Sequence, residues 1–519
     1  MKQGSVAVAL LGVAAAALAL ALGEFVGVVF GDLSLVASVG DVVVDLSPGW
    51  FVRWTIRLLG DAQKPVLLTG VVLLVLLVGA GTGIRARSTR GPVFAAYVVF
   101  GLVGVIAAVR AGSAVTGSVA ASSAVVVGLF ALRRGVGLLT FVPVEEEHPS
   151  FEDPRDKIAS RRGFLAYASG MTLAAGAMGL GSRLVADQGA EEMRRQVAIP
   201  RARRTVANRP SPTSSTEAPW TAPPSLTSWT TPNDRFYRID TALVVPKIDP
   251  ESWSLRIDGM VERAVELSLA DLFAMNVVDS AVTLACVSNE VGGHLVGNAV
   301  WTGVPLVDVL ELAGPTEPAE QVMAWSVDSF SAGFPLSALG SDRTALVAFG
   351  MNGEPLPFRH GFPVRLVVAG LYGYVSAVKW LERIELTTMD VDGYWIPRGW
   401  AKEAPIKIAS RIDVPLQSQT TPGGQAVAGV AWAPVVGVAE VELAIDDGPW
   451  TSCRLERGTG PGRDGEAWVQ WFTLWDAEPG LHHLRVRAWD RNGVLQPPGP
   501  KHIAPDGAEG YHTRRVLVA

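Results

Sequence analysis

The chain has 519 residues, a length that predicts several domains rather than one. Hydrophobic residues make up 49% of it and charged residues only 18%, below the roughly one quarter that is typical of soluble proteins, so part of the chain is expected to lie in lipid. The net charge of −6 leaves no basic surplus for neutralising phosphates, so nucleic acid is not an expected partner. Two cysteines exclude a disulfide scaffold and any four-cysteine zinc or iron–sulfur site.

Uncharged stretches of membrane-spanning length dominate the chain before residue 185. A bilayer core requires roughly 20 apolar helical residues. Buried helices of a soluble protein are the alternative, which the occurrence of Lys and Arg only between the stretches disfavours. We therefore predict a membrane domain over 1–185, formed by a bundle of five transmembrane helices. The predicted crossings are 4–23, 65–84, 91–109, 111–132 and 163–182.

The charges that flank these stretches predict their orientation. The loop 85–90 and the segment after the fourth stretch are basic, whereas the loop 31–64 also carries several aspartates. Because basic loops stay in the cytoplasm, we expect a cytoplasmic N-terminus, a multi-pass protein of the cell membrane and an extracytoplasmic position for everything after residue 185. The residues that carry this prediction are Asp32, Asp41, Asp45, Asp61, Arg133, Arg134, Lys157, Arg161 and Arg162.

A candidate export motif agrees with the orientation that the loop charges predict. Residues 160–165 read Ser-Arg-Arg-Gly-Phe-Leu, which matches the twin-arginine pattern at Arg161 and Arg162. An ordinary positively charged flank is the alternative. The twin-arginine route carries folded proteins, which suits a domain that receives a cofactor in the cytoplasm.

None of the seven histidines lies in a predicted crossing, so these crossings offer no pair of histidines for haem. We therefore expect no haem, and we interpret the membrane part as an anchor or a docking surface for a partner.

Three further segments follow the membrane domain. Residues 186–232 are predicted to be a linker rich in Pro, Ser and Thr. Residues 233–412 mix short β runs with helix candidates at 269–275 and 306–313, which predicts an α+β domain. Residues 413–519 alternate apolar and polar positions between Gly-containing turns, which is typical of an antiparallel β-sandwich of immunoglobulin type.

Four sequence blocks carry the candidate chemistry. The run 282–294 places Cys286 at the end of a β-like segment, before a Gly-rich loop. The others are MNGEPLPFRHGFPVR over 351–365, GLYGYVSAVKW over 370–380 and YWIPRGW over 394–400. In this order and spacing the blocks resemble the sulfite oxidase family of molybdenum enzymes, over about 233–519. The resemblance extends to the C-terminal β-sandwich, which is similar to that family's dimerisation domain.

The resemblance implies a molybdenum–molybdopterin cofactor, a pyranopterin dithiolene, with the Cys286 thiolate as the protein ligand of the metal. A buried inert thiol, or a disulfide with Cys453, is the alternative. The family pattern assigns contacts with the pterin and its phosphate to His360, Arg365, Ser376 and Lys379. It places Asn233, Phe236, Tyr237 and Ser326 along the cofactor. The alternatives are solvated strand ends for Arg365 and Lys379 and core positions for Phe236 and Tyr237.

Departures from the family pattern concern the substrate pocket. Ser288-Asn289-Glu290 stands where sulfite oxidases have Gly-Asn-Arg, and Arg238 lies one position out of register with a family arginine. Trp400 takes the position of an active-site tyrosine. Because a dianion such as sulfite requires several cations around it, these departures weigh against sulfite. Arg238, His294 and Trp400 remain the candidate pocket residues.

The sequence therefore predicts a membrane-anchored molybdenum oxidoreductase that performs two-electron oxygen-atom transfer on a small extracytoplasmic substrate. The oxo group on molybdenum is expected to exchange with water. A sulfoxide reductase with the same cofactor is one alternative. A non-catalytic, membrane-tethered β-sandwich protein for adhesion or docking is another. The expected partners are a separate electron-transfer protein, either a cytochrome or a membrane redox subunit, and a second copy bound through the C-terminal domain.

Overall fold

The computed structural model describes residues 2–31, 34–59, 62–86, 91–110, 113–140, 154–202, 204–205, 221–340 and 343–519. The chain divides into two compact units. The first comprises Met1–Glu192 with Ala242–Val245, and the second comprises Met193–Thr241 with Pro246–Ala519.

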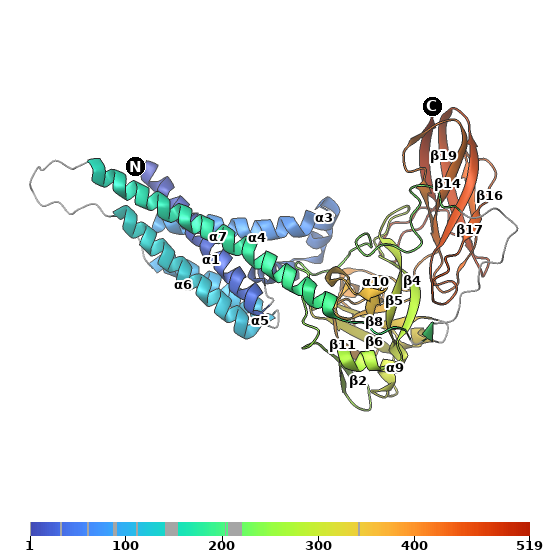
Figure 1. Ribbon diagram of the computed structural model, residues 1–519, viewed down its shortest axis with the longest axis horizontal. Helices are drawn as coiled ribbons and strands as arrows, with labels where there is room; N and C mark the ends of the chain where they lie inside the picture. The colour runs from blue at the N-terminus through green and yellow to red at the C-terminus, as the bar shows by residue number, and fades with distance from the viewer. Residues whose placement is uncertain are drawn as a thin grey trace, which may run out of the picture. The chain divides into compact units, whose positions relative to one another are not determined.

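The first unit is mainly helical in its described part (Figure 1). Its helices are α1 (Lys2–Gly31), α2 (Leu35–Leu46), α3 (Gly49–Leu59), α4 (Gln63–Arg85), α5 (Gly91–Arg110), α6 (Ala114–Thr140) and α7 (Pro154–Gln196). In the part of the chain that the structure describes, five helices are long and apolar enough to cross a membrane, with spans of Val6–Phe30, Gln63–Arg85, Gly91–Arg110, Ala114–Leu138 and Gly163–Gly181. The described parts of the predicted crossings are therefore helical except at Ser113, and Asp32, Asp61, residues 87–90 and residues 111–112 lie outside the described residues.

The helical part differs from the sequence-based expectation in two places. The segment 31–64, expected to be a loop, contains α2 and α3. Helix α7 continues to Gln196, into the predicted linker, because residues 186–196 contain no proline and the first one follows at Pro200. The backbone of Arg161 and Arg162 lies in α7, whereas their side chains lie outside the described part of the chain.

Helix α2 begins at a polar cap that links it to α1. The Ser34 hydroxyl accepts a hydrogen bond from the Ala37 backbone N–H at 3.1 Å and donates one to Glu24 Oε2 at 2.9 Å. Glu24 Oε1 accepts from the Val36 N–H at 2.7 Å. These bonds satisfy N–H groups that a helix start leaves free, and they provide the Glu24 carboxylate with partners.

Glycines allow α1 and α4 to pack closely. A Cβ atom on Gly12 would lie 2.0 Å from the Gly79 carbonyl oxygen, and one on Gly83 would lie 2.1 Å from the Val8 carbonyl oxygen. Small residues at such contacts let helix backbones approach in apolar surroundings. The backbones of α1 and α4 therefore lie in close contact.

The second unit begins with two mixed sheets that hold the candidate site. One has the order β1-β4-β5-β8-β10, with β9 paired to β8, and the other has the order β3-β2-β11-β6-β7. The strands of the first are β1 (Arg204–Thr205), β4 (Val278–Ala285), β5 (Val296–Pro305), β8 (Ala345–Met351), β9 (Glu354–Pro355) and β10 (Arg365–Val368). The strands of the second are β2 (Ser254–Gly259), β3 (Val265–Ser268), β6 (Gln321–Ser326), β7 (Ser331–Pro335) and β11 (Leu381–Thr387).

Helices in this region are short, so the region is β-rich rather than an even mixture of helix and strand. The α-helices are α8 (Leu269–Ala274), α9 (Leu306–Glu311) and α10 (Gly373–Ser376), and the 3₁₀ turns are η2 (Leu336–Leu339), η3 (Phe358–His360) and η4 (Ile396–Arg398). The two predicted helices thus exist. Ser268 caps α8 through a capping box with Asp271, and Gly314 and Pro315 follow soon after α9 and limit its length.

Two further sheets complete the second unit and share one apolar core around Trp471 and Val486. One has the order β12-β14-β18-β17 and the other β13-β20-β19-β15-β16. Their strands are β12 (Ala409–Val414), β13 (Gln419–Thr420), β14 (Gly423–Trp432), β15 (Val438–Ile445), β16 (Thr451–Ser452), β17 (Arg454–Glu456), β18 (Val469–Ala477), β19 (Gly480–Asp490) and β20 (His512–Val518). Buried and less buried positions alternate along β19, as the sequence predicts for one solvated face.

The end of the predicted linker, residues 221–232, is held by β5 and by the sheet that contains β12 and β18. Trp229 and Trp468 are joined by two reciprocal hydrogen bonds. The Trp229 indole N–H donates to the Trp468 carbonyl at 3.1 Å, and the Trp468 indole N–H donates to the Trp229 carbonyl at 2.8 Å. Asn298 Nδ2 also donates to the Trp229 carbonyl, at 2.9 Å. This part of the linker is therefore an ordered segment at the start of the candidate site.

Candidate cofactor and active site

Cys286 directly follows β4 and is buried, with an exposed fraction of 8%. A turn closes over it, in which Asn289 N–H donates to the Cys286 carbonyl at 3.0 Å and Ser288 N–H approaches Sγ at 3.4 Å. Burial raises the pKa of this thiol. Cys286 and Cys453 are both free thiols, so the alternative of a disulfide between them is wrong.

Arg365, the first residue of β10, is a buried cation, 3% exposed. Its guanidinium donates to the His360 carbonyl at 3.1 Å and stands 4.9 Å from the centre of the Trp301 ring. Burial lowers the pKa of Arg365 to about 10, so the group keeps its charge near neutral pH. The alternative of a solvated strand end is therefore wrong for Arg365, and a buried cation held by carbonyls and a ring has capacity left for an anion.

Lys379 is the second buried cation, with an exposed fraction of 9%. Its Nζ donates to Asp240 Oδ2 at 2.8 Å and to the Arg359 carbonyl at 3.3 Å. Burial lowers the pKa of Lys379 to about 8, and the charge of Asp240 opposes this decrease. The alternative of a solvated strand end is therefore wrong for Lys379 as well.

His360 is fully buried, and its ring has one unsatisfied nitrogen. Nε2 lies 2.8 Å from the Asn233 carbonyl oxygen, so this nitrogen carries the proton and donates. Burial lowers the pKa of His360 to about 3, which keeps the ring neutral. Nδ1 is consequently an acceptor, and it has no hydrogen-bond partner among the described residues. A neutral buried acceptor suits an amino or ring N–H group.

The segment that begins at Asn233 lies against His360. The Asn233 side chain donates to Glu354 Oε1 at 2.6 Å and accepts from Asn352 Nδ2 at 2.7 Å. Phe236 is buried, and its ring centre lies 5.6 Å from that of His360 and 5.2 Å from that of Tyr237. Burial raises the pKa of the Tyr237 phenol, and the neighbouring Cys286 raises it further. This effect places Tyr237 near the thiol.

Asp240 connects two of the predicted residues and was missed by sequence reasoning. Its carboxylate accepts from Arg238 Nε at 2.8 Å as well as from Lys379. The Asp240 side chain is 5% exposed, whereas that of Arg238 is 34% exposed. The Arg238 charge is thus compensated by a carboxylate. No sequence motif marks Asp240, because its link to Lys379 joins positions 139 residues apart.

Ser376 and Ser326 are buried but engaged locally. The Ser376 hydroxyl donates to the Tyr372 carbonyl at 3.1 Å, within the turn of α10. Ser326 ends β6, where its backbone pairs with Leu381, and its hydroxyl accepts from Asp328 N–H at 3.4 Å. Both therefore lie on segments next to Lys379.

His294 and Trp400 lie at the margins of this cluster. His294 is exposed in the loop before β5, and its electrostatic neighbour is His512 on β20. Trp400 is half-buried, with its ring centre 5.8 Å from that of Tyr374 on α10. The described interactions do not bring His294 or Trp400 into contact with Cys286.

A small pocket, open to solvent, adjoins the Cys286 loop. Asn289, Tyr372 and Lys407 line it together with Glu509, which pairs with Lys407 at 2.6 Å. Burial raises the pKa of Tyr372 to about 12, and the charge of Cys286 contributes to this increase. Sequence reasoning did not select Tyr372, although it lies within the block 370–380.

The donors present fit a bulky anionic cofactor better than a bare metal ion. Among the described residues, no group of three or more His, Cys, Asp or Glu side chains could hold a metal ion. Cys286 alone offers a soft ligand. The buried Arg365 and Lys379 suit a phosphate, and the unpaired Nδ1 of His360 suits a polar ring. The site therefore fits a metal that arrives with its own organic ligand.

Comparison with known proteins gives the same class. A family model described as the oxidoreductase molybdopterin binding domain matches residues 242–395. Mitochondrial sulfite oxidase of Macaca fascicularis is 30% identical over 323 residues, covering 53% of this chain and 59% of that enzyme. Sulfite oxidase of Gallus gallus is 30% identical over 317 residues, covering 51% of this chain and 68% of that enzyme. A solved structure titled sulfane dehydrogenase SoxCD, from Paracoccus pantotrophus, has a TM-score of 0.49 at 21% identity and covers 58% of this chain and 88% of that one.

The chain is thus a molybdopterin-binding oxidoreductase. It belongs to the sulfite oxidase family, as its sequence blocks predict. It spans 59% of the length of the macaque and human enzymes. Membership of an enzyme family removes the support for a non-catalytic adhesion protein.

Proposed function

We propose that the chain is a membrane-anchored molybdenum-cofactor oxidoreductase that performs two-electron oxygen-atom transfer on a small substrate outside the cytoplasm. One observation carries this proposal: the buried thiol Cys286 lies within electrostatic range of the buried cation Lys379, and the buried Arg365 and His360 lie in the same cluster. When bound, the molybdenum–pterin group supplies the oxygen-atom and electron transfer.

The residues of this chain would bind and orient that group. Arg365 would hold the phosphate through its fork of N–H groups, and Lys379 would add a point charge. His360 Nδ1 would accept a hydrogen bond from the pterin ring, because the Asn233 carbonyl fixes the proton on Nε2. Cys286 would bind molybdenum as a thiolate. Since burial disfavours the free thiolate, its deprotonation would depend on the metal.

The pairing of Arg238 with Asp240 bears on the substrate. A dianion such as sulfite needs uncompensated cations, whereas the charge of Arg238 is matched at 2.8 Å by a carboxylate. A small uncharged substrate suits such a pocket better. This ion pair favours the second candidate, a sulfoxide reductase with the same cofactor, over oxidation of sulfite.

The finer organisation is proposed on the same basis. We assign 1–185 to the membrane domain, 186–232 to the linker, 233–412 to the catalytic domain and 413–519 to an immunoglobulin-like domain suited to dimer formation. The basic flanks and the twin-arginine pattern support an extracytoplasmic catalytic domain. A separate cytochrome or membrane subunit would exchange electrons with the cofactor.

Metal analysis and a matched pair of cysteine variants test the proposal. The full chain, purified from a host that makes the cofactor, should contain about one molybdenum per chain and turn over a sulfoxide or sulfite with an artificial electron carrier. Cys286→Ser should abolish turnover, because a hydroxyl replaces the thiolate ligand. Cys453→Ser changes a buried thiol in the C-terminal sheets and should retain turnover. Absence of molybdenum from the loaded protein, or full activity of Cys286→Ser, would refute the assignment.

A further inference from the structure

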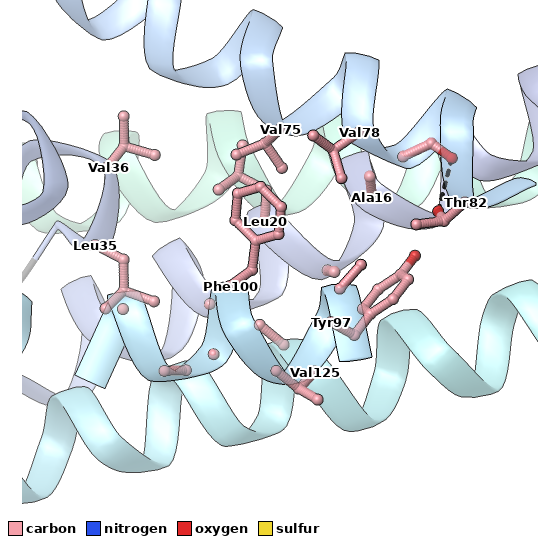
Figure 2. A pocket seen from close by; sticks show the side chains of 18 of the residues that line it. Ala16, Leu20, Leu35, Val36, Val75, Val78, Thr82, Tyr97, Phe100 and Val125 are labelled. Atoms are coloured by element: carbon pink, nitrogen blue, oxygen red, sulfur yellow. Dashed lines mark hydrogen bonds between the residues drawn. The ribbon is translucent and has the colours of Figure 1, made fainter. Parts of the chain in front are cut away.

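An apolar cavity lies within the helical first unit, among α1, α2, α4, α5 and α6 (Figure 2). It opens to the outside of the helices. Aliphatic side chains such as Leu20, Val36, Val75 and Val125 form its walls, and no charged residue lines it among those the structure describes.

One polar group without a partner faces this apolar space. The Tyr97 side chain lies at one end of the cavity, opposite the end formed by Leu35 and Val36 (Figure 2). Tyr97 is 8% exposed, and its hydroxyl has no hydrogen-bond partner of normal geometry among the described residues. The nearby Thr82 hydroxyl donates to the Gly79 carbonyl at 2.8 Å. The Tyr97 hydroxyl can therefore donate to a ligand in the cavity.

The position of Tyr97 along its helix indicates where this donor lies. Tyr97 is six residues beyond the start of α5 at Gly91, which corresponds to about 9 Å along the helix axis. At such a depth in a membrane-crossing helix, water is scarce and an unpaired hydroxyl is costly. We therefore expect the acceptor of this hydrogen bond to belong to a ligand that enters from the lipid.

We propose that this cavity binds a membrane quinone, with a quinone carbonyl accepting a hydrogen bond from Tyr97 and the isoprenoid tail lying along the aliphatic walls. Phe100 lies one helical turn from Tyr97 on the same side of α5 and also lines the cavity, so a flat ring would have an aromatic neighbour. A phospholipid also has carbonyls and apolar chains. Its charged head group lies next to those carbonyls, however, and the cavity offers no charged side chain to receive it.

Two pairs of matched variants test this binding site in the full chain. Tyr97→Phe removes only the unpartnered hydroxyl, and its control Tyr167→Phe removes a hydroxyl of α7 that donates to the Ala131 carbonyl at 3.1 Å. Val75→Trp fills the cavity from α4. Its control, Leu77→Trp, adds the same bulk to α4 at a side chain that is 69% exposed and does not line the cavity.

The measurements are the quinone and phospholipid that co-purify with the chain, quantified by mass spectrometry, and the Kd for added decylubiquinone in nanodiscs. We expect about one quinone per chain. Tyr97→Phe should raise the Kd about five- to tenfold, as expected for one lost hydrogen bond. Val75→Trp should raise it by more than tenfold, while Tyr167→Phe and Leu77→Trp should stay within about twofold of the parent.

Several outcomes would overturn the inference: no quinone binding, phospholipid alone in the cavity, equal effects of the two tyrosine variants, or unchanged affinity in Val75→Trp. The binding measurement needs no turnover, so it is separable from the proposed reaction. Loss of quinone binding with normal molybdenum content and turnover contradicts only the cavity assignment. Quinone binding without molybdenum contradicts only the proposed function.

Discussion

Asp240 and Lys379 form an ion pair of 2.8 Å in which the carboxylate side chain is 5% exposed and the ammonium side chain 10%. The same carboxylate oxygen accepts from Arg238 Nε, also at 2.8 Å. Because the pair is buried, salt screens it far less than a surface pair. Asp240 therefore controls how much positive charge Lys379 presents to a bound anion.

Replacing Asp240 with Asn should change the pH dependence of cofactor retention. Burial lowers the pKa of Lys379 to about 8, and the Asp240 charge opposes this decrease. Without the carboxylate the pKa of Lys379 falls further, so its charge is lost at a lower pH. Molybdenum content after gel filtration, measured from pH 6 to 9, should decline with rising pH in both proteins, and at a lower pH in the variant.

Asp258→Asn is the matched control, since Asp258 pairs with Arg256 and Arg383 on β2 and β11. It should leave the retention profile unchanged. Tighter cofactor retention in Asp240→Asn would contradict the interpretation, because the carboxylate would then act mainly by repelling the phosphate.

Arg365→Gln should separate cofactor binding from folding. Burial lowers the pKa of Arg365 to about 10, so the charged guanidinium is partly disfavoured in the folded protein. Removing it should lower molybdenum and pterin content at least tenfold. The Tm of the cofactor-free protein should stay equal or rise, because the substitution removes a buried charge that has no carboxylate partner. A large decrease in that Tm would show that Arg365 serves folding instead.

Trp229→Phe should destabilise the second unit. The substitution removes the indole N–H that donates to the Trp468 carbonyl at 3.1 Å. The expected loss is about 1–2 kcal/mol of unfolding free energy, read as a lower thermal midpoint of the full chain in detergent. Trp325→Phe is the control, because the Trp325 indole N–H has no hydrogen-bond partner in the described part of the chain. Equal effects of the two variants would remove the hydrogen bond as the cause.

Replacing Arg161 and Arg162 together by Lys tests export. If the pair is read as a twin-arginine signal, a phosphatase reporter fused to the C-terminus should lose its extracytoplasmic activity, because Lys keeps the charge but not the recognised group. The same change at Arg133 and Arg134 should leave export intact. Normal export of the first variant would show that Arg161 and Arg162 act only as a positive flank.

Sequence reasoning succeeded where the signal is local. The five apolar stretches needed only length and composition, and the two short helices at 269–275 and 306–313 needed only apolar spacing. The end of β4 before Cys286 was likewise visible from its β-like run.

Long-range contacts explain what the sequence did not reveal. Helix α2 carries Gly40, Asp41 and Asp45, which are typical of a loop, and its start is fixed by Glu24 on the preceding helix. Asp240 has no motif of its own and gains its role from Lys379, 139 residues later. The orientation of His360 depends in the same way on the Asn233 carbonyl, 127 positions away.

The exchange of indole hydrogen bonds between Trp229 and Trp468 joins positions 239 residues apart. At translation rates of about 5–20 residues per second, Trp468 leaves the ribosome roughly 10–50 s after Trp229. The segment around Trp229 is therefore held in place only after the residues that lead into β18 have been made. Folding of the second unit is consequently completed only after Trp468 has emerged, well after α1 to α6.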